Sequence, residues 1–109
     1  MSRAEIGLSA FAAARATGAR VIDVREPDEY AAGHVPGALL APMARLAEVR
    51  AQLPPREPVY VICASGNRSR AAAAFLAQLG IPAYSVTGGT AAWARAGHPV
   101  AHGGGECLV

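Results

Sequence analysis

Cys63 is the residue of this sequence best placed for nucleophilic chemistry. It directly follows the apolar run 59–62 and begins a short loop, residues 63–68, that leads into an alanine-rich segment. A cysteine at this position lies where a strand ends and a helix begins, and ligands bind at that edge of open α/β sheets. Small residues and Gly66 allow the loop to curl, so that its backbone N–H groups and the dipole of the following helix attract negative charge. The loop is therefore expected to hold an anion.

Such surroundings favour the thiolate form of Cys63. Converging N–H groups and a helix N-terminus lower the pKa of a cysteine from about 8.5 into the range of roughly 3.5 to 7.5, which makes a ready nucleophile at neutral pH. A buried structural cysteine is the alternative, because free cysteines commonly pack as small apolar side chains. The nucleophilic role requires an accessible thiol and amides that point towards it.

The rest of the loop supplies candidates for binding an anionic substrate. Arg68 brings a positive charge to the end of the loop, and Arg70 is a weaker candidate. The helix dipole disfavours an arginine at this position, which favours a functional role over a structural one. Ser69 is expected to be the N-cap of the following helix, and the polar side chains of Ser65 and Asn67 can turn towards the pocket. The expected substrate-binding residues are Ala64, Ser65, Gly66, Asn67, Arg68 and Ser69.

Short strand-like and helix-like segments alternate along the chain. Helices are predicted over 8–16, 27–33, 42–53, 69–79 and 88–96, and strands over 20–24, 37–41, 59–62 and 83–86. Ser9 is expected to cap the first helix, and Gly18 to end it. The run 59–62 is apolar throughout, which indicates a strand covered on both faces in the middle of a sheet. Because parallel strands need crossover connections, this alternation predicts an α/β fold with a mostly parallel sheet and helices on both faces.

The length and composition of the chain limit the fold to one globular domain. A chain of 109 residues can bury enough surface for one packed core. We expect a single domain over 1–109, with its core over about 4–100 and a flexible tail over 101–109. Hydrophobic residues make up 52% and charged residues 17% of the sequence, a composition too apolar for a disordered segment.

The charge and the apolar runs argue against nucleic-acid binding and membrane insertion, and the cysteine content indicates the compartment. The net charge is +2 and the arginines are scattered rather than grouped, so no nucleic-acid surface is expected. The longest apolar stretches, such as 71–77, are far shorter than the ~20 residues of a membrane helix, so no membrane insertion is expected. Two cysteines without a charged and apolar leader favour a cytoplasmic protein over a secreted disulfide framework.

Four groups of residues, in order along the chain, resemble the signatures of the rhodanese domain family. They are Asp23-Val24-Arg25 with Glu29-Tyr30, the segment 33–38, the loop 63–69, and the segment 86–89 with Trp93. Together they span most of the chain from Val21 to Val100. The resemblance implies a single rhodanese-like α/β domain with a five-stranded parallel sheet between helices. It also implies a sulfurtransferase activity that needs no metal or organic cofactor.

The resemblance implies roles for individual residues as well. The Cys63 thiolate would attack the outer sulfur of a donor such as thiosulfate, release sulfite and hold the sulfur as a persulfide. A thiol, cyanide or a thiol-carrying protein would then accept the sulfur. Arg68 would bind the anionic donor, and the loop amides would stabilise the charge of the bound sulfur. Asp23, Arg25 and Glu29 are expected to form a polar network that braces the site without reacting.

The sequence leaves two other functions open. A phosphatase or arsenate reductase of related architecture has a Cys-x5-Arg loop that encircles a tetrahedral oxyanion. Arg68 lies only five residues after Cys63, and the loop lacks a carboxylate that could serve as a general acid. A rhodanese module can also bind partners or carry sulfur without turnover, but such modules often lack the cysteine that is present here.

Other residues with possible chemistry receive structural interpretations. Gly88-Gly89 lacks the spacing of a phosphate-binding loop and is expected to permit a tight turn from strand to helix. His98 and His102 are separated by a proline that prevents the helical geometry of a metal site, so no metal is expected. Cys107, which follows three glycines, is either a mobile resolving thiol that accepts sulfur from the nucleophile or an idle surface cysteine.

Overall fold

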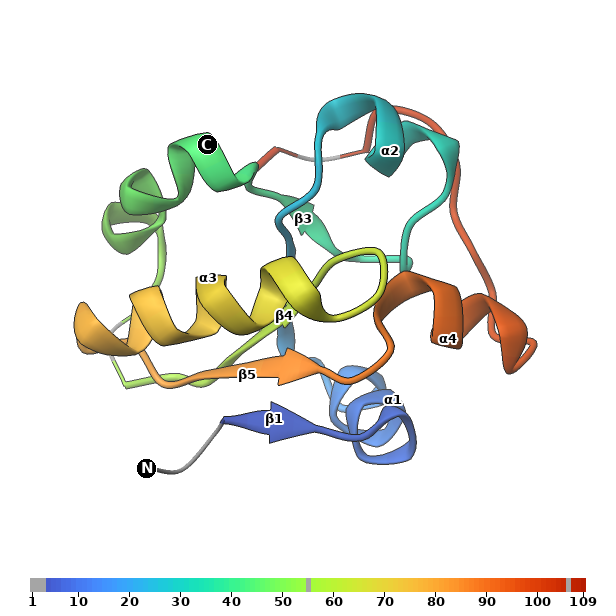
Figure 1. Cartoon of the computed structure of the whole chain (residues 1–109), viewed down its shortest axis with the longest axis horizontal. Coiled ribbons are helices and arrows are strands. Elements are labelled where there is room, and N and C mark those ends of the chain that lie inside the picture. Colours follow the sequence, from blue (N-terminus) through green and yellow to red (C-terminus); the bar gives the residue numbers. More distant parts are fainter. Residues whose placement is uncertain (1–3, 55, 106) are drawn as a thin grey trace.

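The computed structural model describes residues 4–54, 56–105 and 107–109. Its five strands are β1 (Glu5–Ile6), β2 (Arg20–Asp23), β3 (Leu39–Leu40), β4 (Val59–Ile62) and β5 (Ala83–Val86). They form one sheet in the order β1-β5-β4-β2-β3, in which all neighbouring strands are parallel (Figure 1). The predicted α/β class with a mostly parallel sheet is confirmed, and the strand number agrees with the one that the resemblance implied.

A helix lies in each connection between successive strands, as parallel strands require. The helices are α1 (Leu8–Ala16), α2 (Pro27–Ala32), the 3-10 helix η1 (Met43–Gln52), α3 (Asn67–Gln78) and α4 (Gly89–Arg95). Side chains of α1, α2 and α4 share one apolar cluster, and side chains of α3 and η1 share another. Figure 1 shows α1 and α4 grouped together, away from α3 and η1. The sheet is therefore covered by helices on both faces, as predicted.

Apolar side chains pack on both faces of β4. Val59 and Val61 belong to the cluster with α3 and η1, whereas Ile62 belongs to the cluster with α1, α2 and α4. The second cluster contains Phe11 and Trp93, whose rings meet edge to face at 5.5 Å. Because β4 is third in the strand order, its predicted position in the middle of the sheet is confirmed. Burying each of these large side chains contributes roughly 1.5–3 kcal/mol, which holds β4 firmly up to the loop that follows it.

Two predicted helix caps differ from the structure. α1 begins after Gly7 and has no side-chain cap, so the prediction for Ser9 is wrong. α3 begins at Asn67 with Gly66 as its N-cap, so Ser69 lies in the first turn of the helix and is not the N-cap. Gly66 occupies the cap because its φ of +106° lies in the left-handed region that favours glycine.

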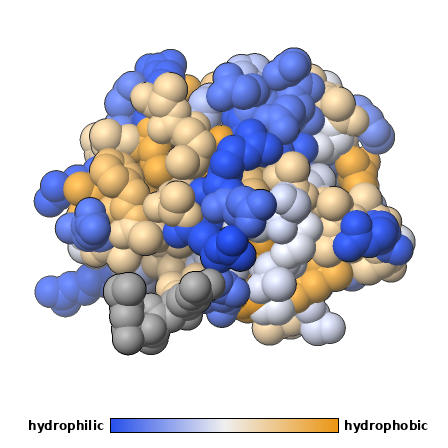
Figure 2. Space-filling view, in the orientation of Figure 1, coloured by the Kyte–Doolittle hydropathy of each residue, from blue (hydrophilic) through white to orange (hydrophobic). Residues whose placement is uncertain are grey.

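The helix predicted after Pro42 is a 3-10 helix rather than an α-helix. Leu46 and Val49 are buried, and Met43 is half-buried against the same cluster. Their spacing of three residues matches the three residues per turn of a 3-10 helix, so these side chains align on the core side. Figure 2 shows apolar surface over this helix and α3, where Phe75 is exposed.

The segment after α4 passes around α2 and returns to the β3 edge of the sheet (Figure 1). Ala101 pairs with His34, and the N–H of Leu108 donates to the carbonyl of Leu40 at 2.8 Å. Leu108 and Val109 pack against the cluster that contains α3. These contacts lie in the segment 101–109, whose flexibility stays a prediction.

Neither a membrane helix nor a metal cluster occurs among the described residues. Each described helix falls short of the length and hydrophobicity that crossing a bilayer demands. The described His, Cys, Asp and Glu side chains form no group of three that could hold a metal ion. The His98 ring stacks on Trp93 instead, with the ring centroids 4.2 Å apart.

Candidate active site

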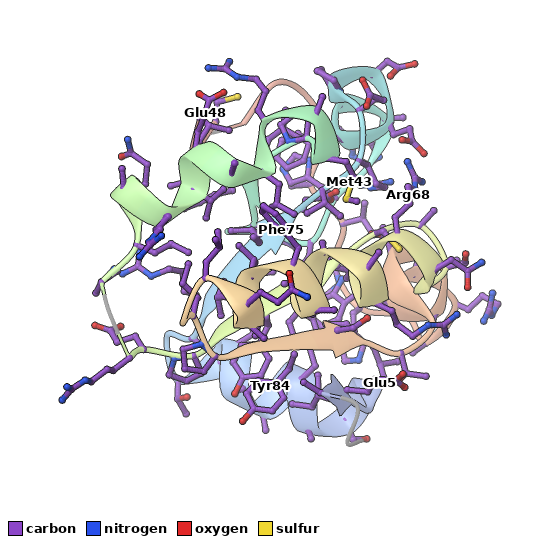
Figure 3. The ribbon with its side chains drawn as sticks, turned by 60° about the vertical axis from the view of Figure 1, so that its left-hand side comes forward. Glu5, Met43, Glu48, Arg68, Phe75 and Tyr84 are labelled. Carbon is purple, nitrogen blue, oxygen red and sulfur yellow. The ribbon has the colours of Figure 1, made fainter. Side chains whose placement is uncertain are left out.

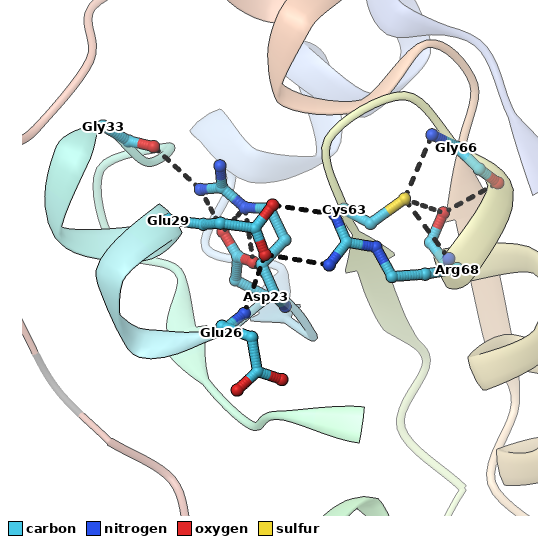
Figure 4. Close-up of polar contacts among 9 residues, drawn as sticks. Asp23, Glu26, Glu29, Gly33, Cys63, Gly66 and Arg68 are labelled. Atoms are coloured by element: carbon cyan, nitrogen blue, oxygen red, sulfur yellow. Dashed lines mark hydrogen bonds and ion pairs between the residues drawn. The ribbon is translucent and has the colours of Figure 1, made fainter. Parts of the chain in front are cut away.

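Cys63 directly follows β4, and backbone N–H groups of the next residues point at its sulfur. The N–H of Gly66 donates to Sγ at 3.0 Å, and the N–H of Ser69 donates to it at 3.3 Å (Figure 4). One of these amides belongs to the bend and the other to the first turn of α3. The loop and the helix N-terminus therefore both present positive dipole ends to the sulfur.

The thiol itself is buried, because only 1% of the surface of Cys63 is exposed. Cys63 packs in the same apolar cluster as Ala72 and Ala73 of α3. The expectation of an accessible thiol is therefore wrong for this structure, because the loop closes around Sγ and turns it inwards. Apolar packing is not the whole environment of this sulfur, however, because it also receives two N–H groups.

The surroundings of Cys63 act on the pKa of its thiol in opposite directions. Burial raises the pKa, because it penalises the charged thiolate. The hydrogen bond between the thiol and the Ser69 side chain lowers it, and so do hydrogen bonds from the N–H groups of Ser69, Gly66 and Ser65. The hydrogen bonds prevail, so the pKa of Cys63 lies below its ordinary value. The loop therefore stabilises a thiolate despite the burial of the sulfur.

The first turn of α4 holds the start of the loop in place. The N–H of Thr90 donates to the carbonyl of Cys63 at 2.8 Å, and the N–H of Ala91 donates to the carbonyl of Ala64 at 3.0 Å. Gly89 packs so closely that a Cβ on it would lie 2.5 Å from the Cys63 carbonyl oxygen. The sequence predicts the tight turn at Gly88-Gly89 but not the close approach of Gly89 to Cys63. The paired glycines are the only local feature of the sequence that could have indicated it.

Arg68 forms a two-pronged ion pair with Glu29 of α2 (Figure 4). Its two terminal nitrogens donate to the two carboxylate oxygens at 2.8 and 2.9 Å. The hydrogen bond from Arg68, with a second one from the N–H of Glu26, lowers the pKa of Glu29 to about 2. The positive charge expected for substrate binding is therefore compensated by a carboxylate. Glu29, which the sequence assigns to structural support, is in contact with the active-site loop.

Asp23 and Arg25 form a separate, buried ion pair at the end of β2. The Arg25 Nε donates to Asp23 at 3.0 Å and its Nη2 donates to the other carboxylate oxygen at 2.9 Å. The same Nη2 donates to the carbonyl of Gly33 at 2.8 Å. These contacts connect β2 to the end of α2, the helix that carries Glu29. The bracing role of this pair stays a prediction.

The remaining residues of the predicted set lie around the rim of the loop. Ala64 is half-buried, whereas the side chains of Ser65 and Asn67 are exposed. Asn67 accepts a hydrogen bond from Arg70 at 2.8 Å, so these two side chains are paired with each other on the surface. Figure 3 shows Arg68 at the start of α3, on the side of the helix that faces α2. Ser65 lowers the pKa of the Cys63 thiol through its backbone N–H and not through its side chain.

Ser85 of β5 is a polar neighbour of the site that sequence reasoning missed. It is 1% exposed, and its Oγ lies 2.6 Å from Oγ of Ser69. The Cys63 thiol in turn donates to Ser69 Oγ at 3.4 Å. Nothing in the local sequence signals this contact, because it joins a strand to a helix 16 residues away in the chain.

Cys107, the possible resolving thiol, lies on the far side of β2 and β3. Its backbone pairs with Leu40, Leu40 pairs with Asp23, and Asp23 pairs with Ile62 next to Cys63. Three steps between neighbouring strands correspond to roughly 14 Å. A reaction between the two cysteines would require the C-terminal segment to leave the β3 edge.

The sequence and the structure of this chain are both similar to those of known proteins. Residues 8–96 match the family of rhodanese-like domains. A thiosulfate sulfurtransferase named GlpE from Pseudomonas entomophila is 40% identical over 82 residues, which cover 74% of this chain and 75% of the relative. The crystal structure of a rhodanese-related protein from Thermoplasma volcanium is 36% identical, with a TM-score of 0.82 over 89% of this chain and 96% of the other. That of a thiosulfate sulfurtransferase from Pseudomonas aeruginosa is 29% identical, with a TM-score of 0.88 over 98% of this chain and 21% of the other.

Proposed function

Because the chain belongs to the family of rhodanese-like domains, we propose that it is a thiosulfate sulfurtransferase that acts through a persulfide on Cys63. The family membership confirms the resemblance seen in the sequence. The observation that carries the proposal is the pair of amides, from Gly66 and Ser69, that point at the Cys63 sulfur. The 40% identical relative, itself a thiosulfate sulfurtransferase, supports thiosulfate as the donor.

The proposed reaction has two displacement steps at sulfur. In the first, the Cys63 thiolate attacks the outer sulfur of thiosulfate, the bond between the two sulfur atoms of the donor breaks, and sulfite leaves with its electron pair. The product is an anionic persulfide, and amides that stabilise the thiolate are suited to stabilise this charge too. In the second step, cyanide or a thiolate attacks the outer persulfide sulfur, and Cys63 leaves as the thiolate.

Binding of the donor requires a change at the Arg68–Glu29 pair. Arg68 is the cation of the loop, and both of its terminal nitrogens are occupied by Glu29. Cys63 is 1% exposed, so the donor reaches it only after neighbouring side chains move. The two side chains of the ion pair are 40% and 35% exposed, and exposed ion pairs are weak. We expect the anionic donor to replace Glu29 as the partner of Arg68.

A module that binds partners without turnover is the second candidate, and the burial of Cys63 is the observation that favours it. A steady-state assay of thiocyanate formation from thiosulfate and cyanide separates the two functions. Continuous turnover by the wild-type chain, lost in Cys63→Ser, supports the sulfurtransferase. Turnover indistinguishable from buffer, with a correctly folded wild-type chain, would leave the binding module as the function. Retained turnover in Cys63→Ser would refute the role of Cys63.

A further inference from the structure

The hydroxyl of Ser69 lies among three polar groups. Its Oγ is 3.4 Å from Sγ of Cys63, 3.2 Å from the carbonyl oxygen of Gly66 and 2.6 Å from Oγ of Ser85. Ser69 and Ser85 are both buried, at 0% and 1% exposure. A serine hydroxyl has one proton to donate, so Ser69 can donate to only one of these neighbours at a time.

The protonation state of Cys63 decides how the hydroxyl protons are arranged. A thiol donates its own proton to Ser69 Oγ, which leaves the Ser69 proton for the Gly66 carbonyl or for Ser85. A thiolate can only accept, so the Ser69 proton stabilises it best by turning towards Sγ. In that arrangement Ser69 Oγ has a free acceptor position next to Ser85, and the Ser85 hydroxyl can fill it.

We propose that Ser85 is a positioning residue for the nucleophile, whose hydroxyl donates to Ser69 and thereby directs the Ser69 hydroxyl towards the Cys63 thiolate. The thiol proton itself leaves to water, and the two serine hydroxyls only rotate. Ser85 has no direct hydrogen bond to Cys63 in this arrangement and acts through Ser69. This role rests on the proposed function of Cys63 as the nucleophile.

The position of Ser85 in the sheet supports this role. Ser85 pairs with Val61 of β4, so its side chain is on the same face as that of Val61, which packs in the cluster with α3. The neighbouring Tyr84 points the other way and is exposed. A buried hydroxyl among apolar groups is costly unless it is hydrogen-bonded, and Ser69 is the partner that the structure gives it.

The charged groups near Ser85 and the site come from several elements, and the nearest along the sheet is the exposed Glu5 of β1, which pairs with Ser85 in the strand register. Arg68 comes from α3, Glu29 from α2, and the Asp23–Arg25 pair from the end of β2. From β5 and α4, the titratable side chains are the exposed Tyr84 and Arg95, the last residue of α4. Replacing Ser85 by an uncharged residue leaves all of these groups in place. A change in the titration of Cys63 in such a variant is therefore attributable to the hydroxyl.

The rate of Cys63 alkylation by iodoacetamide as a function of pH tests the proposal. The reagent is neutral and reacts with the thiolate, and the mass of the Cys63 peptide distinguishes this reaction from that of Cys107. Ser85→Ala should move the midpoint of the profile up by as much as about one pH unit, because without the Ser85 donor the Ser69 hydroxyl is no longer directed towards the thiolate and its hydrogen bond to Sγ weakens. Ser85→Thr, which keeps the hydroxyl, should restore the wild-type midpoint.

Two further variants make the test specific. Tyr84→Phe removes the hydroxyl of the residue next to Ser85 on β5, which is exposed and points away from the site, and should leave the midpoint unchanged. Ser69→Ala and the double variant Ser69→Ala/Ser85→Ala should share one midpoint, because Ser85 acts only through Ser69. Should Ser85→Ala fail to fold, Ser85→Thr and Ser85→Val can be compared instead. These two side chains match in shape, and only threonine has the hydroxyl, so only Ser85→Val should raise the midpoint.

An unchanged midpoint in folded Ser85→Ala overturns the proposal. An equal shift in Tyr84→Phe, or a further shift from Ser85→Ala in the Ser69→Ala background, overturns it as well. None of these outcomes depends on sulfur transfer. A wild-type chain that forms no thiocyanate would contradict the proposed function, while the alkylation profiles would still report on the two serines.

Discussion

At the scale of single residues, the Arg68–Glu29 pair would set the charge that the donor meets in the proposed reaction. The two side chains are held by hydrogen bonds of 2.8 and 2.9 Å, and they are 39 residues apart in the sequence. The sequence identifies Arg68 as a cation beside the nucleophile, but the partner that compensates it depends on how α2 packs against the loop. In the proposed reaction, an anionic donor would compete with the Glu29 carboxylate for this guanidinium.

Glu29→Gln is expected to lower the KM for thiosulfate about twofold to fivefold, because exposed ion pairs contribute about 0.4–1 kcal/mol. Glutamine keeps an oxygen that can accept the N–H of Glu26, so the start of α2 should remain intact. Initial rates of thiocyanate formation at varied thiosulfate concentration give the KM. Glu48→Gln, which breaks an ion pair with Arg45 in η1, is the control and should leave the KM unchanged. If the KM of Glu29→Gln equals or exceeds that of the wild type, Glu29 does not compete with the donor for Arg68.

The stability contributed by Glu29 should fade in acid. Its folded pKa of about 2 lies below the ordinary value of 4.5, so the carboxylate stabilises the fold above pH 4.5 and the effect is lost as the pH falls towards 2. Because the pair is 35–40% exposed, screening limits the contribution to about 1 kcal/mol or less. Urea unfolding of the wild type and Glu29→Gln should show a smaller difference at pH 3 than at pH 7. An equal difference at both pH values would count against the lowered pKa.

At the scale of elements, the loop after β4 is shaped by the two helices that follow it in the chain. α3 supplies the N–H of Ser69 to the sulfur, and the first turn of α4 supplies N–H groups to the carbonyls of Cys63 and Ala64. The loop therefore has its N–H groups directed at Cys63 and its first carbonyls directed at α4. Gly89 makes this arrangement possible, because any side chain there would meet the loop backbone.

Gly89→Ala is expected to lower sulfur transfer strongly, because its Cβ would lie 2.5 Å from the Cys63 carbonyl oxygen and would displace the loop. Gly18→Ala is the matched control. Gly18 also has a positive φ, of +94° against +60° for Gly89, but a Cβ there meets nothing within 4 Å. Both variants should lose about 1–2 kcal/mol of stability from the left-handed backbone, and Gly89→Ala should lose more because of its contact with the loop. Thiocyanate assays and urea unfolding of both variants test this, and similar transfer rates in the two would show that the Gly89 contact is unimportant.

At the scale of the whole molecule, the alternation of short apolar segments, separated by turn residues, was enough to predict the fold class. The run 59–62 predicts the central strand because it is apolar on both faces, and the structure places it third of five. β1 is only two residues long, too short for a sequence pattern, and it is defined by pairing with β5. The hydrophobic spacing after Pro42 fits either an α- or a 3-10 helix, and packing against the core decides between them.

The site was predicted less completely than the fold, because much of it consists of contacts between distant segments. The loop 63–69 is continuous in sequence, so its strand, bend and helix could be inferred together. The hydroxyl pair of Ser69 and Ser85 joins two elements, and the burial of Cys63 depends on how tightly the loop closes. Neither follows from local propensity. They require the packed structure.

A substitution in one apolar cluster should change the free energy of unfolding without changing the pKa of Cys63, because the two clusters lie on opposite faces of the sheet. Phe11 is fully buried in the cluster that does not contain Cys63. Phe11→Ala should lower the free energy of unfolding by about 3–5 kcal/mol, while the pH midpoint of Cys63 alkylation stays at its wild-type value. Phe75→Ala, at an exposed position of α3, should cost less than about 1 kcal/mol. Urea unfolding and peptide-resolved alkylation measure both quantities, and a shifted midpoint in folded Phe11→Ala would contradict the separation.

The central claim is that Cys63 accepts a sulfur atom from the donor. Its most direct test is the mass of the Cys63 peptide before and after incubation of the protein with thiosulfate, under conditions that preserve persulfides. The account predicts a gain of one sulfur atom on that peptide, removed again by cyanide, and no gain in Cys63→Ser. An unchanged Cys63 peptide, or a sulfur atom found only on the Cys107 peptide, would contradict it.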